Sequence, residues 1–281
     1  MRIKKIISIA PFLLVLALAA QSLYATEKIA SKTPRLDNPY PKVAKAYAVL
    51  VDDQWQWGKN VDMPLPLASL TKLMTAVLVV ETGNLDATAT VSSSSVKAKP
   101  FVARLKKGDK MTVRELLNIM LVSSANDACL ALAEHIAGSE QAFVVQMNAR
   151  AKLMGLQHTN FENACGFDKL RHRSTIRDLV ALTRLALSHT EIADAVQQSS
   201  YRVALQNGRV IDVKSTNELI GHSDGVVGVK TGFTNNAGRC LIALSKRDQH
   251  EVLLVFLNAR NRWWNAAALL ERAFARVVVA S

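Results

Sequence analysis

Residues 66–76 read Pro66-Leu67-Ala68-Ser69-Leu70-Thr71-Lys72-Leu73-Met74-Thr75-Ala76. Apolar residues at 70, 73, 74, 77 and 78 follow helical spacing and predict a helix from about Ser69 to Glu81, ended by Gly83. A helix places Ser69 and Lys72 on one face, within contact. A neutral lysine there can remove the serine proton and make the hydroxyl a nucleophile. The alternative is a serine near a helix start with a solvated lysine.

A second short motif, Ser124-Ala125-Asn126, follows an apolar stretch. Serine and asparagine are common helix caps, which is the simpler interpretation. The functional interpretation is that the Ser124 hydroxyl relays a proton to a leaving group. The Asn126 amide then binds substrate backbone and holds Lys72.

A third motif, Lys230-Thr231-Gly232, ends an apolar strand. A strand edge can hold an extended peptide through main-chain hydrogen bonds, while Lys230 and Thr231 offer donors to a carboxylate. Gly232 permits close approach of a substrate. Burial and a second cation both lower a lysine pKa, and Lys230 is the candidate cation beside Lys72. Backbone N–H groups of Ser69 and Phe233 are the expected oxyanion donors.

In this order, the three motifs resemble the S-x-x-K, S-x-N and K-T-G pattern of penicillin-binding proteins and serine β-lactamases. Over roughly residues 44–275 the chain resembles the serine-type D-Ala-D-Ala carboxypeptidases, the low-molecular-mass penicillin-binding proteins. The resemblance implies that Ser69 attacks the carbonyl of the penultimate D-Ala in a peptidoglycan stem peptide. The terminal D-Ala leaves and water hydrolyses the acyl-enzyme. It also implies that β-lactams acylate the same serine and that no metal or organic cofactor takes part.

The flanking sequence predicts an α/β (α+β) fold, in which an antiparallel sheet flanked by helices carries an inserted all-α lobe at about 84–195. Strands come from both ends of a peptidase domain spanning 44–281. Asn207-Gly208 predicts a hairpin between strands 201–205 and 209–213, and a hairpin turn is expected at Gly58-Lys59-Asn60. Many members of the family carry a further β-domain and an amphipathic anchor after the peptidase domain. Neither a C-terminal β-domain nor a C-terminal membrane anchor is expected here.

The N-terminus has basic residues at 2, 4 and 5, an apolar run at 6–20 and small residues up to Ala25. This pattern predicts a signal peptide at 1–25, followed by a polar linker at 26–43. An uncleaved anchor is the alternative. Either way the chain is expected to be exported, to the periplasm or the cell envelope. The net charge of +12 suits an anionic envelope, and no motif indicates nucleic acid as a partner.

There are three cysteines, Cys129, Cys165 and Cys240. Because Cys129 lies in an apolar helical run, we expect it to be a buried thiol. If a disulfide forms in the exported chain, the expected pair is Cys165–Cys240. No C-x-x-C or Cys/His cluster indicates a metal site.

Three alternatives to the carboxypeptidase remain. A DD-endopeptidase, which cleaves D-Ala–diaminopimelate crosslinks, uses the same serine chemistry. A class A β-lactamase needs a glutamate in a Glu-x-x-Leu-Asn run, and none of the glutamates between the second and third motifs has it: Glu134, Glu140, Glu162, Glu191 and Glu218. A non-catalytic peptidoglycan-binding or β-lactam-sensing protein would have no need for all three motifs.

Overall fold

The computed structural model describes residues 36–280. The predicted signal peptide at 1–25 and most of the predicted linker at 26–43 lie outside the described residues. No helix within 36–280 combines the length and apolar character needed to span a membrane.

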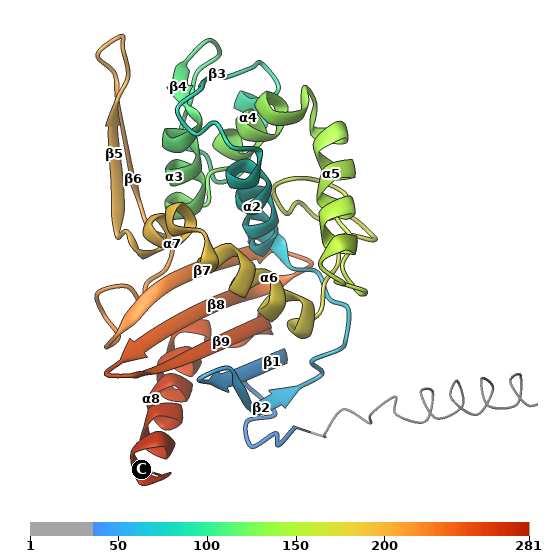
Figure 1. The fold of residues 1–281 in the computed structure, drawn as a ribbon, viewed down its shortest axis with the longest axis vertical. Coiled ribbons are helices and arrows are strands. Elements are labelled where there is room, and N and C mark those ends of the chain that lie inside the picture. The colour runs from blue at the N-terminus through green and yellow to red at the C-terminus, as the bar shows by residue number, and fades with distance from the viewer. Residues whose placement is uncertain (1–35, 281) are drawn as a thin grey trace, which may run out of the picture. The chain divides into compact units, whose positions relative to one another are not determined.

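A five-stranded antiparallel sheet lies between helices on its two faces (Figure 1). Its strand order is β2-β1-β9-β8-β7. The strands are β1 (Ala44–Val51), β2 (Gln54–Lys59), β7 (Val226–Thr234), β8 (Gly238–Arg247) and β9 (His250–Ala259). The two ends of the chain therefore share one sheet, and β7, which carries the third motif, is an edge strand.

Helices cover both faces of this sheet, which explains why its central strands are apolar on both sides. On one face, α8 (Arg262–Ala280) packs residues such as Leu269 and Phe274 against Tyr47 and Phe256. On the other face, the core continues into α2 (Lys72–Thr82) and α6 (Ile176–Ser188). The predicted fold class is confirmed.

The segment between β2 and β7 is mostly helical. Its remaining helices are α3 (Val113–Ser123), α4 (Asn126–Ala137), α5 (Glu140–Leu153) and α7 (Thr190–Gln197). The short 3₁₀ turns are η1 (Ala68–Thr71) and η2 (Ser95–Lys97), and the small strand pairs are β3 (Thr88–Thr90) with β4 (Lys110–Thr112) and β5 (Ser200–Ala204) with β6 (Val210–Lys214). A capping box formed by Thr112 and Glu115 begins α3. Because the start of α3 is fixed in this way, the position of the second motif at its C-terminal end is fixed as well.

The sequence correctly predicts the hairpin around Asn207-Gly208, but the predicted turn at Gly58-Lys59-Asn60 is wrong. Gly58 and Lys59 belong to β2, and the turn lies earlier, at Asp52-Asp53. Both aspartates have positive φ, 47° and 63°. A two-residue hairpin turn of this kind needs positive φ at both central positions, which aspartate tolerates.

Candidate active site

Ser69 lies in η1, at the entrance to α2. Ala68, the residue before it, has φ +49°, an uncommon conformation for a residue with a Cβ. Lys72 is the first residue of α2. The predicted single helix from Ser69 thus begins as a tighter 3₁₀ turn, which still places the Lys72 Nζ 3.0 Å from the Ser69 Oγ.

The Lys72 amine has three partners although its side chain is fully buried. Besides Ser69, its Nζ lies 2.7 Å from the Asn126 Oδ1 and 2.7 Å from the Cys165 carbonyl oxygen. Burial and, second, the nearby Lys230 charge hold the pKa of Lys72 well below its usual value. A neutral amine has two N–H bonds for the two oxygens that only accept. Its lone pair is then left for the Ser69 hydroxyl, which donates.

The second motif lies at the junction of two helices. Ser124 ends α3 in the left-handed conformation, with φ +61°, and Asn126 begins α4. Ser124 is therefore a helix end, whereas the sequence indicated a helix start. The Asn126 side-chain amide donates to the Pro100 carbonyl while its oxygen accepts from Lys72. Asn126 thus joins Lys72 to the loop that carries Phe101.

The third motif lies in β7, directly beside η1. A Cβ on Gly232 would lie 3.1 Å from the Ser69 backbone nitrogen, so any other residue would have to push η1 away by a few tenths of an ångström. Lys230 is buried and donates to the Thr231 carbonyl at 3.1 Å. Burial and then the Arg262 guanidinium lower the pKa of Lys230 to about 7. Lys230 is thus the expected second basic group, and its charged form is one of the causes that lower the pKa of Lys72.

Thr231 connects the third motif with the second. Its hydroxyl lies 2.6 Å from the Thr216 hydroxyl. The Thr216 backbone N–H donates to the Val122 carbonyl, two residues before Ser124. The segment around Thr216 therefore spans the gap between the end of α3 and β7.

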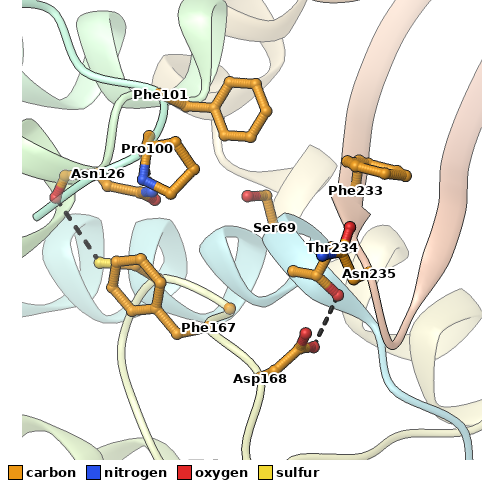
Figure 2. Close-up of a pocket in the computed structure, with 11 residues that line it drawn as sticks. Ser69, Pro100, Phe101, Asn126, Phe167, Asp168, Phe233, Thr234 and Asn235 are labelled. Carbon is orange, nitrogen blue, oxygen red and sulfur yellow. Dashed lines mark hydrogen bonds between the residues drawn. The ribbon is translucent and has the colours of Figure 1, made fainter.

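A cleft of about 320 Å³ opens above Ser69 (Figure 2). Phe101 and Phe233 lie on either side of the serine. Of the residues predicted for the site, Ser69, Asn126 and Phe233 line the cleft, while Lys72, Ser124, Lys230 and Thr231 are buried beneath it. The complete lining is Ser69, Pro100, Phe101, Asn126, Cys165, Gly166, Phe167, Asp168, Phe233, Thr234 and Asn235.

Comparison with known proteins identifies the family of the chain. A family model described as D-alanyl-D-alanine carboxypeptidase matches residues 37–261. The chain belongs to this family.

Two relatives illustrate the range of the family. The chain is 32% identical to the D-alanyl-D-alanine carboxypeptidase DacF of Bacillus subtilis, over 78% of this chain and 59% of that one. It therefore spans less than two thirds of the length of DacF. It is 30% identical to a D-alanyl-D-alanine endopeptidase of Pseudomonas aeruginosa, over 86% of this chain and 81% of that one.

Solved structures show the same fold. The Streptomyces K15 DD-transpeptidase superposes with a TM-score of 0.79 at 27% identity, covering 85% of this chain and 100% of the other. Penicillin-binding protein D2 of Listeria monocytogenes, solved in an ampicillin-bound form, superposes with a TM-score of 0.70 at 31% identity. That match covers 84% of this chain and 100% of the other.

The disulfide of this family member is not the predicted one. Cys129 pairs with Cys165, with Cα atoms 5.9 Å apart, and Cys240 is a buried free thiol on β8. The expectation of a free Cys129 was wrong. Cys129 follows Asn126 by three residues on α4, so both face the same loop. The disulfide ties the Lys72-binding carbonyl of Cys165 to α4.

A buried histidine, His172, stabilises the backbone just before Ser69. It was not predicted from the sequence. The His172 Nδ1 accepts from the Glu162 N–H at 2.9 Å, so a neutral ring carries its proton on Nε2. Nε2 lies 2.7 Å from the Thr71 hydroxyl, which donates to the Ala68 carbonyl at 2.7 Å. This chain of hydrogen bonds holds the strained residue before Ser69. No local pattern reveals it, because 101 positions separate His172 from Thr71.

Proposed function

We propose that this chain is a serine DD-peptidase that removes the terminal D-Ala from peptidoglycan stem pentapeptides through an acyl-enzyme. The observation that carries the proposal is the Lys72 amine, which is buried, has a lowered pKa and lies 3.0 Å from the Ser69 Oγ. A serine so paired with a base can act as a nucleophile.

In the proposed reaction, the Ser69 Oγ attacks the carbonyl carbon of the penultimate D-Ala as its proton passes to the Lys72 Nζ. The backbone N–H groups of Ser69 and Phe233 stabilise the oxyanion. The tetrahedral intermediate collapses when the proton held by Lys72 passes through the Ser124 hydroxyl to the leaving amine, and free D-Ala departs. Water then attacks the ester carbonyl as one of its protons passes to the neutral Lys72 amine. Lys72 returns that proton to the Ser69 Oγ as the shortened peptide is released.

The carboxylate of the terminal D-Ala would bind Lys230 and Thr231. The Thr216 hydroxyl, 2.6 Å from that of Thr231, supplies one more polar group there. Some carboxypeptidases of the family place an arginine at the position before Asn217. In this chain Thr216 stands at that position.

A DD-endopeptidase that cleaves D-Ala–diaminopimelate crosslinks is the second candidate. Two relatives carry that name and support this candidate, the P. aeruginosa endopeptidase at 30% identity and an Escherichia coli endopeptidase at 28% identity. The acyl half of the substrate and the serine chemistry are the same in both reactions.

β-Lactams are the proposed covalent inhibitors, since they mimic D-Ala-D-Ala and offer Ser69 a strained amide. Ampicillin binding by the Listeria relative supports this. Rapid β-lactam hydrolysis is not proposed. None of the five candidate glutamates lines the cleft formed by the described residues. Glu134, Glu140 and Glu162 accept hydrogen bonds from serine hydroxyls or backbone N–H groups instead.

The proposed location is the cell envelope, reached by the predicted signal peptide, where peptidoglycan is the partner. The N-terminal charge and apolar pattern support export. The substrate of a DD-peptidase lies outside the cytoplasmic membrane, which agrees with that location.

Product analysis tests the proposal. The purified protein and its Ser69→Ala variant are each given a disaccharide-pentapeptide and a D-Ala–diaminopimelate crosslinked dimer. Free D-Ala from the pentapeptide alone identifies a carboxypeptidase, and monomers from the dimer identify an endopeptidase. If neither substrate turns over, or if turnover survives in Ser69→Ala, the proposal is wrong. Covalent labelling by a fluorescent penicillin separates the enzyme from a non-catalytic binding protein.

A further inference from the structure

Asp168 is the one charged side chain among the described residues that line the cleft. It is exposed and extends from the loop after Gly166 toward β7 (Figure 2). Its Oδ1 accepts from the Thr234 hydroxyl at 2.6 Å and its Oδ2 from the Asn236 N–H at 3.3 Å. Both donors are neutral. Within residues 36–280 no lysine, arginine or histidine nitrogen lies within 4.0 Å of this carboxylate, so its charge has no ionic partner there.

Asp168 lies beside Thr234, near the end of β7. This position indicates which half of the substrate it faces. In the proposed function, the terminal carboxylate binds at Lys230 and Thr231 and the scissile carbonyl lies between Ser69 and Phe233. Thr234 is three residues beyond Thr231, about 10 Å farther along the strand. A peptide extended along β7 therefore places the residue that precedes the two D-Ala units beside Thr234 and Asp168.

That preceding residue carries an amine in peptidoglycan stems with diaminopimelate or lysine. We propose that Asp168 binds the side-chain ammonium of this residue and so selects stem peptides whose amine is free. The inference rests on the proposed function. It holds for both the carboxypeptidase and the endopeptidase, because the two reactions share this acyl half.

The surroundings of Asp168 suit such a ligand. Phe167 and Phe233 line the cleft on the path from Ser69, and their rings can cover the methylene chain that leads to the ammonium. An ammonium group has three donors and no acceptor, and a carboxylate has free lone pairs beyond those used by Thr234 and Asn236. The chain as a whole carries +12, which repels a cationic side chain. The Asp168 carboxylate attracts the ammonium group at the point of contact and so offsets this repulsion locally.

The test compares Asp168→Asn with the wild-type enzyme on two tripeptides. One is Nα-acetyl-L-Lys-D-Ala-D-Ala, with a free side-chain amine, and the other is its Nα,Nε-diacetyl form. Asparagine keeps an oxygen for the Thr234 hydroxyl and removes the charge, and it also replaces the oxygen that accepts the longer hydrogen bond from the Asn236 N–H. We expect kcat/KM for the free-amine peptide to fall about three- to five-fold, as for a partly exposed ion pair. We expect kcat/KM for the diacetyl peptide to stay unchanged, and the selective loss to shrink in high salt.

A matched pair of diaminopimelate tripeptides, with the distal amine free or acetylated, distinguishes the two sources of the ammonium. Selective loss in either pair supports the inference and identifies the amine. Equal loss on all four peptides means that Asp168 only holds the β7–β8 turn and overturns it, as does no change on any of them. Asp212→Asn, an exposed aspartate on β6, is the control for loss of one negative charge. If the wild-type enzyme hydrolyses none of the peptides, the proposed function itself has failed.

Discussion

The floor of the cleft (Lys72, Asn126 and Lys230) and its rim (Phe101, Asp168 and Phe233) are built in different ways. On the floor, Lys72 is 0% and Lys230 1% exposed, and Asn126 is buried. On the rim, Phe101 is 52% and Phe233 45% exposed, and Asp168 is exposed as well. The floor side chains are bound to fixed oxygens of the chain, whereas the two rim phenylalanines project toward open solvent.

This difference separates two tasks. Groups that move protons, and buried groups that hold the reacting end of the substrate, act best when they are preorganised and dry, because no reorganisation then accompanies the reaction. Groups that recognise the rest of the substrate must exchange water for ligand and so stay open. Substitutions on the floor should therefore abolish the chemistry for every substrate, while those on the rim should change the choice between substrates.

The largest effect is expected on the floor, at Lys72. Lys72→Met keeps an unbranched side chain but removes the base, and it leaves the Asn126 Oδ1 and the Cys165 carbonyl without their donor. We expect acylation by a fluorescent penicillin to slow about 10⁴-fold, as when one member of a catalytic unit is lost. Stopped-flow or gel-based labelling measures the rate.

Lys152→Met, on the exposed side of α5, makes the same exchange away from the cleft and should label at the wild-type rate. Thermal unfolding of both variants shows whether the fold is kept. Labelling of Lys72→Met within ten-fold of wild type would remove Lys72 as the base.

A smaller but still large effect is expected at Gly166. It has φ +95°, and an added Cβ would lie 2.0 Å from the Ala68 carbonyl oxygen and 2.8 Å from the Ser69 nitrogen. Gly166→Ala must displace the backbone on which Ser69 sits. We expect penicillin acylation to fall about 100-fold, the effect of a 1 Å misplacement at a reacting group, and stability to fall by about 4 kcal/mol.

Gly83 provides a matched control, because its φ is +100° and an added Cβ meets nothing within 4 Å. Gly83→Ala should have the conformational cost alone, about 1 kcal/mol, with normal acylation. If the two variants are equally active, contact with η1 does not matter and the floor is less rigid than we infer.

The disulfide is expected to matter next. It closes a loop between positions 36 residues apart, Cys129 and Cys165. Replacing both by alanine should lower the free energy of unfolding by about 3 to 4 kcal/mol. Acylation should slow less than in Gly166→Ala, because the Cys165 carbonyl still faces Lys72 but loses its tether to α4. Denaturant unfolding and penicillin labelling measure the two effects.

Cys240→Ala is the control, since Cys240 is buried but unpaired. Thiol counts on the unfolded, unreduced wild type and Cys240→Ala variant test the connectivity. One free thiol in the wild type and none in Cys240→Ala agree with the Cys129–Cys165 bond. Three free thiols in the wild type, or two in Cys240→Ala, contradict it.

The sequence predicts contacts between residues that are close in the chain, and it does not predict contacts between distant loops. Ser69 and Lys72 are three residues apart, so helical geometry alone brings them together. The turn at Asp52-Asp53 was missed because two aspartates at positive φ replaced the glycine that usually signals it. The Cys129 partner, the position of His172 and the placement of Asp168 depend on loops that meet only after folding. Local periodicity carries no information on such contacts.

The smallest effect, spread over a pH range, is expected at His172 below the floor. Burial is the main cause that lowers the pKa of His172 from 6.5 to about 4. Between these values the unfolded chain binds a proton that the folded protein excludes, so stability rises with pH. Its contribution is complete above pH 6.5 and is lost as pH falls to 4, by about 3 kcal/mol.

Urea unfolding at several pH values measures this contribution when wild type is compared with His172→Gln, which can still reach Thr71 but does not titrate. The wild-type stability should fall more steeply below pH 6.5 than that of the variant, since other titrating groups are common to both. His222→Gln, at an exposed position, should parallel the wild type. Parallel curves for wild type and His172→Gln would mean that His172 takes up its proton in the folded state. The hydrogen-bond chain from Glu162 to Ala68 would then have to open at mildly acidic pH, and the floor would be no more rigid than the rim.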